Sequence, residues 1–261
     1  MSLPTPRTFL SRRPARSESG GPRLLVGFVV IFLILQGVAE LLGSDRGQAG
    51  LLVGAVVVAA TLAAERFVFG RPVAAGARDV GLGIPAGRGL RTAAALGLLL
   101  LLVIPAYAGF TGASVDLFPG WAWLLPGLFG QAGVAEEVLF RGYLFRHIRK
   151  GRPFWRAAFL SAVPFVAVHL LLFLTLPWAV ASAAVLLATV LSFPLAYLYE
   201  LGDDTIWAPA LVHFVIQGAI KVFVVQGPGA DRFPFVWMAA SAVLPFLVFV
   251  VPRRAKPAVG P

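Results

Sequence analysis

Long apolar runs alternate along the chain with short segments in which charges, glycines and prolines gather. A membrane-spanning helix needs roughly 20 mostly apolar residues, which is the length of each run. The runs predict spans at residues 23–43, 50–69, 90–110, 121–146, 154–175, 178–199, 206–226 and 234–252. The pattern therefore predicts an all-α fold, a polytopic membrane bundle of about eight transmembrane helices.

The composition agrees with this membrane interpretation and leaves little sequence for a separate soluble domain. Of the 261 residues, 59% are hydrophobic and 13% are charged, whereas about 25% are charged in soluble domains. Residues 1–22 are rich in Arg, Pro, Ser and Gly, which is typical of a disordered basic tail. We expect a single transmembrane domain at 23–252 and a short cytoplasmic tail at 253–261.

The positive charges predict the orientation of the bundle. The net charge is +10, and the basic residues gather in the N-terminal tail, the 66–91 region, the 146–156 region and the C-terminus. We expect a multi-pass protein of the cell membrane. Cytoplasmic loops of membrane proteins collect Arg and Lys, so both termini are expected on the cytoplasmic side. The lipid bilayer explains the basic charge without a nucleic-acid partner. The acidic connection at 200–204 is the exception to the pattern.

Cysteine is absent from the chain, which removes several kinds of chemistry before any motif is considered. Disulfides, thiolate nucleophiles and cysteine-ligated metals are excluded. Candidate chemistry must therefore come from carboxylates, imidazoles and amides.

One group of polar residues inside a predicted span contains two adjacent carboxylates. A carboxylate at the centre of a span costs at least about 2.5 kcal/mol, so each requires a partner, a cavity or a function. Glu137 and Arg141 are four residues apart, which favours an ion pair on one helix face. Glu136 is turned about 100° from Glu137 and faces a different direction. An ordinary salt bridge near a helix end is the alternative explanation.

The other intramembrane polar groups are imidazoles and an amide. His169 is the only polar side chain in its apolar run, and His213 and Gln217 share one face of another helix. A lone buried histidine is more often a packing residue than a catalyst. Here, however, three separate helices each carry a group suited to proton transfer or oxyanion binding. Taken together, they make packing a weaker explanation for these residues. His147 lies among arginines at a helix end and is expected to take no part.

Two kinds of hydrolytic site are compatible with these groups. A carboxylate and an imidazole can deprotonate a water for attack on a peptide carbonyl, while a second imidazole and an amide stabilise the oxyanion. Alternatively, Glu136, His169 and His213 could hold a divalent metal such as zinc, with water in the open position. The chain lacks the His-Glu-x-x-His helix of many zinc proteases, so we favour the arrangement without a metal or other cofactor.

The order of these residues resembles the CPBP family of intramembrane proteases, also called the Abi or CAAX prenyl protease 2 family. The resemblance covers about residues 120–226 and rests on three elements: Glu136-Glu137-x-x-x-Arg141 followed by Gly142-Tyr143-Leu144, Phe165-x-x-x-His169, and His213-x-x-x-Gln217.

The resemblance implies roles for the individual residues. Glu136 and His169 would activate water, and His213 and Gln217 would serve the oxyanion. Glu137 and Arg141 would orient the site, and Phe165 would pack beside it. CAAX-cleaving members carry Asn where this chain has Gln217, and the longer side chain shifts an oxyanion contact by about an ångström, which places CAAX specificity in question.

The expected function is that of an intramembrane endopeptidase similar to CAAX prenyl proteases. Its substrate would be a peptide or protein that enters from the membrane or the cytoplasmic leaflet, because Glu136 is placed near the cytoplasmic end of its predicted span. The first alternative is a non-catalytic membrane immunity or partner protein. The second is a proton-coupled transporter in which Glu136, His169, His213 and Lys221 form a relay.

Overall fold

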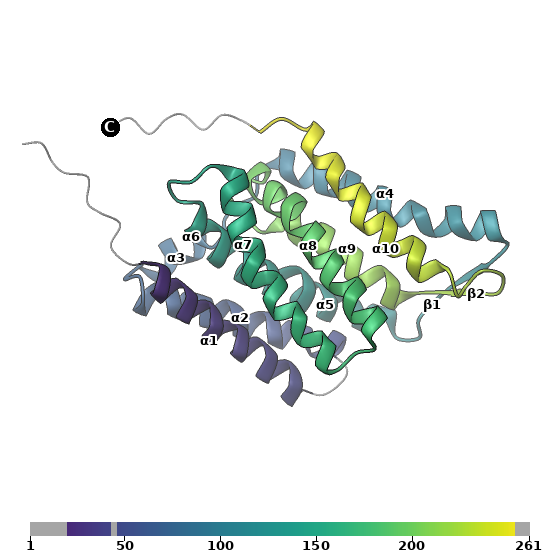
Figure 1. The fold of residues 1–261 in the computed structure, drawn as a ribbon, viewed down its shortest axis with the longest axis horizontal. Coiled ribbons are helices and arrows are strands. Elements are labelled where there is room, and N and C mark those ends of the chain that lie inside the picture. Colours follow the sequence, from purple (N-terminus) through teal and green to yellow (C-terminus); the bar gives the residue numbers. More distant parts are fainter. Residues whose placement is uncertain (1–19, 43–45, 254–261) are drawn as a thin grey trace, which may run out of the picture.

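The structure is a computed structural model that describes residues 20–42 and 46–253. The chain folds into a bundle of helices that run roughly side by side, with α1 and α2 on one side and α4 and α10 on the other (Figure 1). The predicted tails at 1–22 and 253–261 lie outside the described residues, apart from residues 20–22, where the first helix begins, and residue 253.

Apolar helices dominate the bundle, which confirms the all-α fold class. Six helical stretches are long and apolar enough to cross a membrane. Most of their side chains face outward, as expected for lipid-facing helices, since 28–39% of each apolar window is buried. They are Gly21–Leu41 in α1, Ala49–Phe67 in α2, Gly87–Thr111 (α4), Phe154–Leu174 (α7 and η3), Trp178–Leu201 (α8) and Phe233–Val250 (α10 and η4).

The predicted span at 121–146 is helical, although much of it is not α-helical. It runs through α5 (Trp121–Leu128), η1 (Phe129–Ala135), η2 (Val138–Phe145) and α6 (Arg146–Arg149), and both η1 and η2 are π-helical. Glycines and a proline in this segment weaken regular α-helix, and π-helical turns occur frequently at functional sites. This segment and α9 are not among the six long apolar helices, so the count of eight spans stays a prediction.

The predicted span at 206–226 is shorter in the structure. Helix α9 covers Trp207–Val222, and the next four residues form β2 (Phe223–Gln226). This strand pairs antiparallel with β1 (Ser114–Leu117), with Ser114 opposite Gln226. The strand was missed because its residues are as apolar as the helix before it, so the hydrophobic pattern could not separate them.

Glycines allow η1 to approach α2 backbone to backbone. A Cβ on Gly130 would lie 2.6 Å from the carbonyl oxygen of Gly50, and one on Gly54 would lie 2.7 Å from the carbonyl oxygen of Gly130. Small residues at helix contacts permit such close packing in membranes. The contact fixes η1, and therefore the two carboxylates that follow it, in the middle of the bundle.

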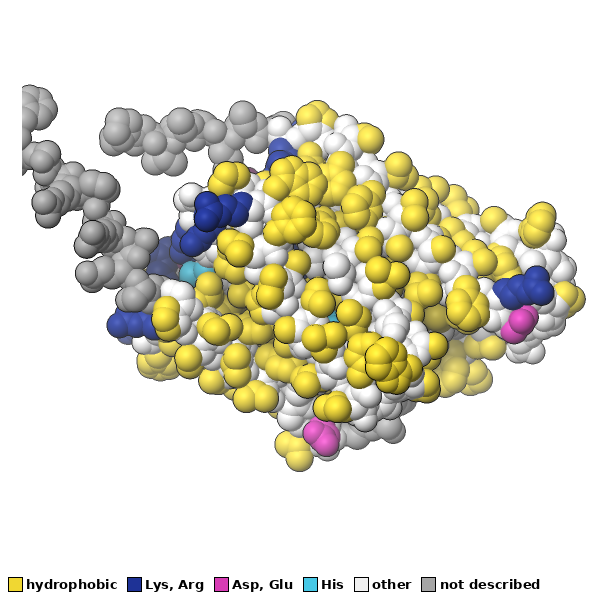
Figure 2. All heavy atoms as spheres, in the orientation of Figure 1, with side chains coloured by type: hydrophobic (Ala, Val, Ile, Leu, Met, Phe, Trp, Pro, Cys, Tyr) yellow, Lys and Arg dark blue, Asp and Glu magenta, His cyan; other side chains and the backbone are white. Residues whose placement is uncertain are grey.

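The two ends of the bundle differ in charge. The short helix α3 (Val73–Asp79) and α6 lie at one end, where basic side chains gather (Figure 2). There Arg146 pairs with Glu65 at 2.5 Å. The sheet of β1 and β2 lies at the opposite end (Figure 1). We call these the arginine-rich end and the sheet end.

Candidate active site

The π-helical segment places its two carboxylates in different surroundings. Glu136 and Glu137 lie between η1 and η2. The Glu137 side chain is fully buried, whereas 17% of the Glu136 side chain is exposed and it lines a cavity. The two adjacent carboxylates therefore face different environments, as their helical spacing predicted.

Glu137 joins two helices through one oxygen atom. Its Oε1 accepts a hydrogen bond from a guanidinium nitrogen of Arg141 at 2.8 Å. The same oxygen lies 2.7 Å from Nδ1 of His213 on α9. The Arg141 guanidinium also lies over the ring of Phe165, 4.9 Å from the ring centre. Glu137, Arg141 and Phe165 thus form a buried support on which His213 is held.

His213 is oriented through both of its ring nitrogens. Because Nδ1 faces the Glu137 carboxylate, it carries the proton and donates it. The amide nitrogen of Gln217 lies 2.8 Å from Nε2, where it donates to the imidazole lone pair. Nε2 is also 3.7 Å from Oε2 of Glu136, too far for a direct hydrogen bond. The ring therefore sits between the structural carboxylate and the cavity carboxylate.

His169 enters the same cavity from another helix. It is the last residue of α7 (Phe154–His169), and its Nδ1 donates to the carbonyl oxygen of Phe165 at 2.7 Å. Its ring packs edge-on against the Phe165 ring, with 4.6 Å between the centres. This hydrogen bond leaves the lone pair of the neutral imidazole on Nε2, which is the form that accepts a proton.

The four predicted catalytic residues line one cavity of about 320 Å³. Its remaining wall is mostly apolar and comes from α1, η1, η2, α7, η3, α8 and α9. The structure thus brings together Glu136, His169, His213 and Gln217, which come from three separate parts of the sequence. Glu137 and Arg141 lie behind this surface, and Phe165 contributes to it.

The cavity extends from the middle of the bundle toward the sheet end. Its lining includes Gln36 near the end of α1, Leu172 in η3, Ala184 near the start of α8 and Lys221 near the end of α9. All four lie in the half of the bundle away from the arginine-rich end. Glu136 lies mid-way along the helical segment from 121 to 149, and the position of this residue relative to the cytoplasmic face stays a prediction.

Two polar lining residues were missed in the sequence. Gln36 and Gln131 both line the cavity. Each is an amide within an otherwise apolar predicted span, which was an available signal. Gln36 comes from the first helix, which lies outside the segment 120–226 that carries the family motifs.

The possible metal ligands do not form a metal site in this arrangement. Among residues 20–42 and 46–253, no group of three or more His, Asp or Glu side chains lies close enough together to hold a metal ion. Both nitrogens of His213 already face hydrogen-bond partners. The set Glu136, His169 and His213 therefore does not fit a metal as placed.

Comparison with known proteins agrees with the resemblance found in the sequence. Residues 118–219 match the family model described as type II CAAX prenyl endopeptidase Rce1-like. The matched segment contains all seven predicted site residues. No curated protein and no solved structure matched the chain. With its apolar helices, the chain is a multi-pass membrane protein that carries an Rce1-like domain of the type II CAAX prenyl endopeptidase family at residues 118–219, in keeping with the CPBP family.

Proposed function

We propose that the protein hydrolyses a peptide bond with a water molecule activated inside the membrane cavity. The observation that carries the proposal is the convergence of Glu136, His169, His213 and Gln217 on one cavity of the bundle. A carboxylate and two imidazoles beside an amide supply the groups that acyl transfer to water requires. The Rce1-like domain supports the same reaction class.

Glu136 is the proposed general base. It takes a proton from water while the water oxygen bonds to the peptide carbonyl carbon, and it returns that proton to the leaving nitrogen when the carbon–nitrogen bond breaks. His169 accepts a hydrogen bond from the water at Nε2 and orients it. The partial exposure of Glu136 to the cavity allows this contact, whereas the buried Glu137 cannot reach the water.

Gln217 and His213 are the proposed oxyanion donors. The Gln217 amide has two N–H groups, of which one faces Nε2 of His213 and the other is available to the oxyanion. Once His213 is protonated at Nε2, this nitrogen donates to the oxyanion and no longer accepts the Gln217 N–H, which is then also available to the oxyanion. The Glu137 carboxylate 2.7 Å from Nδ1 stabilises the imidazolium. Glu137 therefore acts as a positioning residue.

The walls of the cavity favour a substrate that arrives from the membrane. They are mostly apolar, and they lie in the half of the bundle toward the sheet end. With the arginine-rich end in the cytoplasm, this is the non-cytoplasmic half, so we propose access from that half in place of the cytoplasmic leaflet. Lys221 lies one helical turn beyond Gln217 along α9, and its positive charge favours a bond near a peptide's C-terminal carboxylate.

The test is cleavage of a peptide library, including prenylated CAAX peptides, by purified protein in detergent. Wild type is compared with Glu136→Gln and with Glu40→Gln, a control that changes an exposed carboxylate on α1 outside the cavity. We expect cleavage by wild type and by the control, and none by Glu136→Gln. Parallel reactions with a chelator test the metal-free mechanism, which predicts no loss of rate.

The alternative of a non-catalytic immunity or partner protein predicts a different result. Wild type and Glu136→Gln would then both be folded and equally inert across the library. A proton-coupled transporter would be inert as well, and reconstituted wild type would move protons in vesicles. Either result would overturn the hydrolase proposal.

A further inference from the structure

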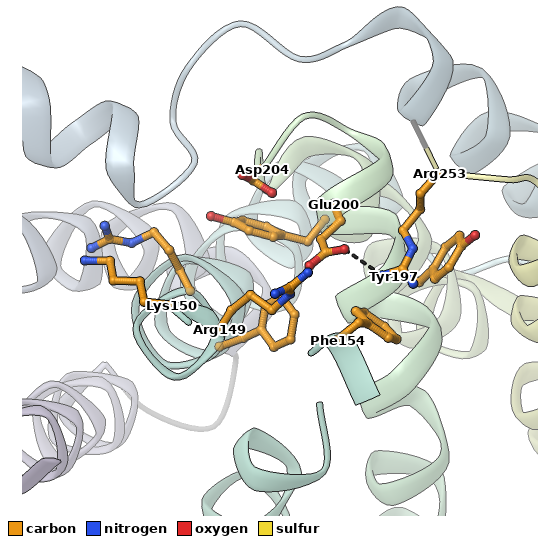
Figure 3. A pocket seen from close by; sticks show the side chains of 10 residues that line it. Arg149, Lys150, Phe154, Tyr197, Glu200, Asp204 and Arg253 are labelled. Atoms are coloured by element: carbon orange, nitrogen blue, oxygen red, sulfur yellow. Dashed lines mark hydrogen bonds and ion pairs between the residues drawn. The ribbon is translucent and has the colours of Figure 1, made fainter. Parts of the chain in front are cut away.

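A second cavity lies at the arginine-rich end and shares no lining residue with the catalytic cavity. Its volume is about 870 Å³. It is surrounded by residues of five segments: α6 and its neighbours, the start of α7, the end of α8, the turn after α8 and the chain after η4 (Figure 3). They are Phe145, Arg146, Arg149, Lys150, Phe154, Tyr197, Tyr199, Glu200, Asp204 and Arg253.

Positive charge exceeds negative charge around this cavity, with four cationic side chains against two carboxylates. Glu200 is already shared by Arg149 at 2.5 Å and Arg253 at 2.6 Å. Both arginines lie near Glu200 on one side of the cavity, while Lys150 lies on the other (Figure 3). The carboxylate that is best placed for pairing is therefore used by other residues.

Lys150 is the exposed cation of this cavity that lacks an ion-pair partner in the part of the chain that the structure describes. Among the described residues, its ammonium forms no ion pair within 4.0 Å. The surrounding protein and the nearby Arg146 guanidinium lower the pKa of Lys150. An anion bound beside this ammonium would relieve the repulsion between the two cations.

A buried hydroxyl in the same wall points to a ligand independently. Tyr199 is 1% exposed, and its hydroxyl has no hydrogen-bond partner in the described structure. Buried hydroxyls are normally paired, and leaving one unpaired destabilises a fold. Tyr199 lines the cavity, and its hydroxyl oxygen is closed off from it by the surrounding side chains. A small shift of the wall on binding would bring an acceptor atom of the bound molecule to this O–H group.

We propose that this cavity binds the phosphate group of an anionic membrane lipid. A phosphate offers several acceptor oxygens and a negative charge, which suit an ammonium and a hydroxyl in one wall. The cavity lies at the start of α7 and the end of α8, two of the helices that are long and apolar enough to cross a membrane. Lipid headgroups surround the ends of such helices in a bilayer. Basic pockets between transmembrane helices bind such headgroups. The site is separate from the proposed catalytic cavity and does not depend on its chemistry.

Thermal unfolding of the purified full chain in detergent tests the proposal. Phosphatidylglycerol, phosphatidylcholine and inorganic phosphate are titrated in parallel. The variants are Lys150→Ala and Tyr199→Phe, with Arg156→Ala as control, because Arg156 is an exposed cation on α7 outside the cavity.

We expect phosphatidylglycerol to raise the melting temperature of wild type and of Arg156→Ala, and phosphatidylcholine to do so far less. Lys150→Ala and Tyr199→Phe should each weaken the apparent affinity for phosphatidylglycerol about tenfold, as the loss of one good hydrogen bond to a charged group predicts. Without lipid, Tyr199→Phe should melt higher than wild type, since it removes an unpaired buried hydroxyl.

Three results would overturn the proposal. The first is an equal response to the anionic and the zwitterionic lipid. The second is an unchanged affinity for phosphatidylglycerol in both cavity variants. The third is a rise in melting temperature with inorganic phosphate after which added phosphatidylglycerol gives no further rise. That result would identify a soluble phosphate compound as the ligand.

Discussion

The shared oxygen of Glu137 allows its structural role to be separated from its role in catalysis. Glu137 and Arg141 have side chains that are 0% and 3% exposed. Glu137→Gln keeps the shape of the side chain but leaves the Arg141 cation buried without a countercharge. Breaking a buried pair in this way costs about 3–5 kcal/mol, which lowers the melting temperature by roughly 10 °C.

The double variant Glu137→Gln/Arg141→Met removes both charges. Replacement of a whole buried pair by an apolar residue of similar size is often neutral, so most of the lost stability should return. Activity should not return, because the neutral amide no longer fixes the proton on Nδ1 of His213. We expect peptide cleavage to remain at least about 100-fold below wild type in both variants, because an amide in place of the carboxylate that orients a catalytic histidine can cost up to about 10⁴-fold.

Thermal unfolding and cleavage rates are measured on the same preparations. The account of His213 orientation is refuted if cleavage recovers together with stability in the double variant, because Glu137 would then be structural alone. The account of the buried pair is refuted if Glu137→Gln melts at the wild-type temperature.

Three further changes have defined expectations. Gly142→Ala places a Cβ against the Val80 carbonyl oxygen and should cost about 1–3 kcal/mol in thermal unfolding, whereas Gly37→Ala enters open space and should not destabilise. Gln217→Asn shortens the side chain by one methylene, so the 2.8 Å contact between the amide and the His213 ring is lost. The cleavage rate should then fall about 100-fold. An unchanged rate contradicts the oxyanion role of Gln217. Burial and the adjacent guanidinium lower the pKa of His147 to about 3. Below about pH 6.5 the unfolded chain therefore binds a proton at His147 that the folded protein does not bind. The free energy of unfolding should fall by up to about 1.4 kcal/mol per pH unit in this range. In His147→Gln this dependence of stability on pH should be weaker.

The local pairs of the site could be predicted from spacing alone. Glu137 and Arg141, like His213 and Gln217, are four residues apart, and each pair is joined by a hydrogen bond of 2.8 Å. Residues at this spacing meet on one helix face whatever surrounds the helix. The same argument separated Glu136 from Glu137.

Contacts between helices could not be predicted in this way. Glu137 and His213 are 76 residues apart, and their 2.7 Å contact depends on how η1, which precedes the two carboxylates, packs against α9. The π-helical turns depend equally on tertiary packing, since the glycines that permit them do not require them. The helical segment begins at Trp121 as predicted and ends at Arg149, three residues beyond the predicted span, because the polar residues at its end continue the helix.

The most direct test of the central claim is peptide cleavage in water enriched in ¹⁸O, followed by mass spectrometry of the products. If Glu136 activates water for attack on the peptide carbonyl, wild type should yield a new C-terminal carboxyl group that carries one ¹⁸O atom, and Glu136→Gln should yield no product. Cleavage by Glu136→Gln at the wild-type rate, or a wild-type product without ¹⁸O, would contradict the proposed mechanism.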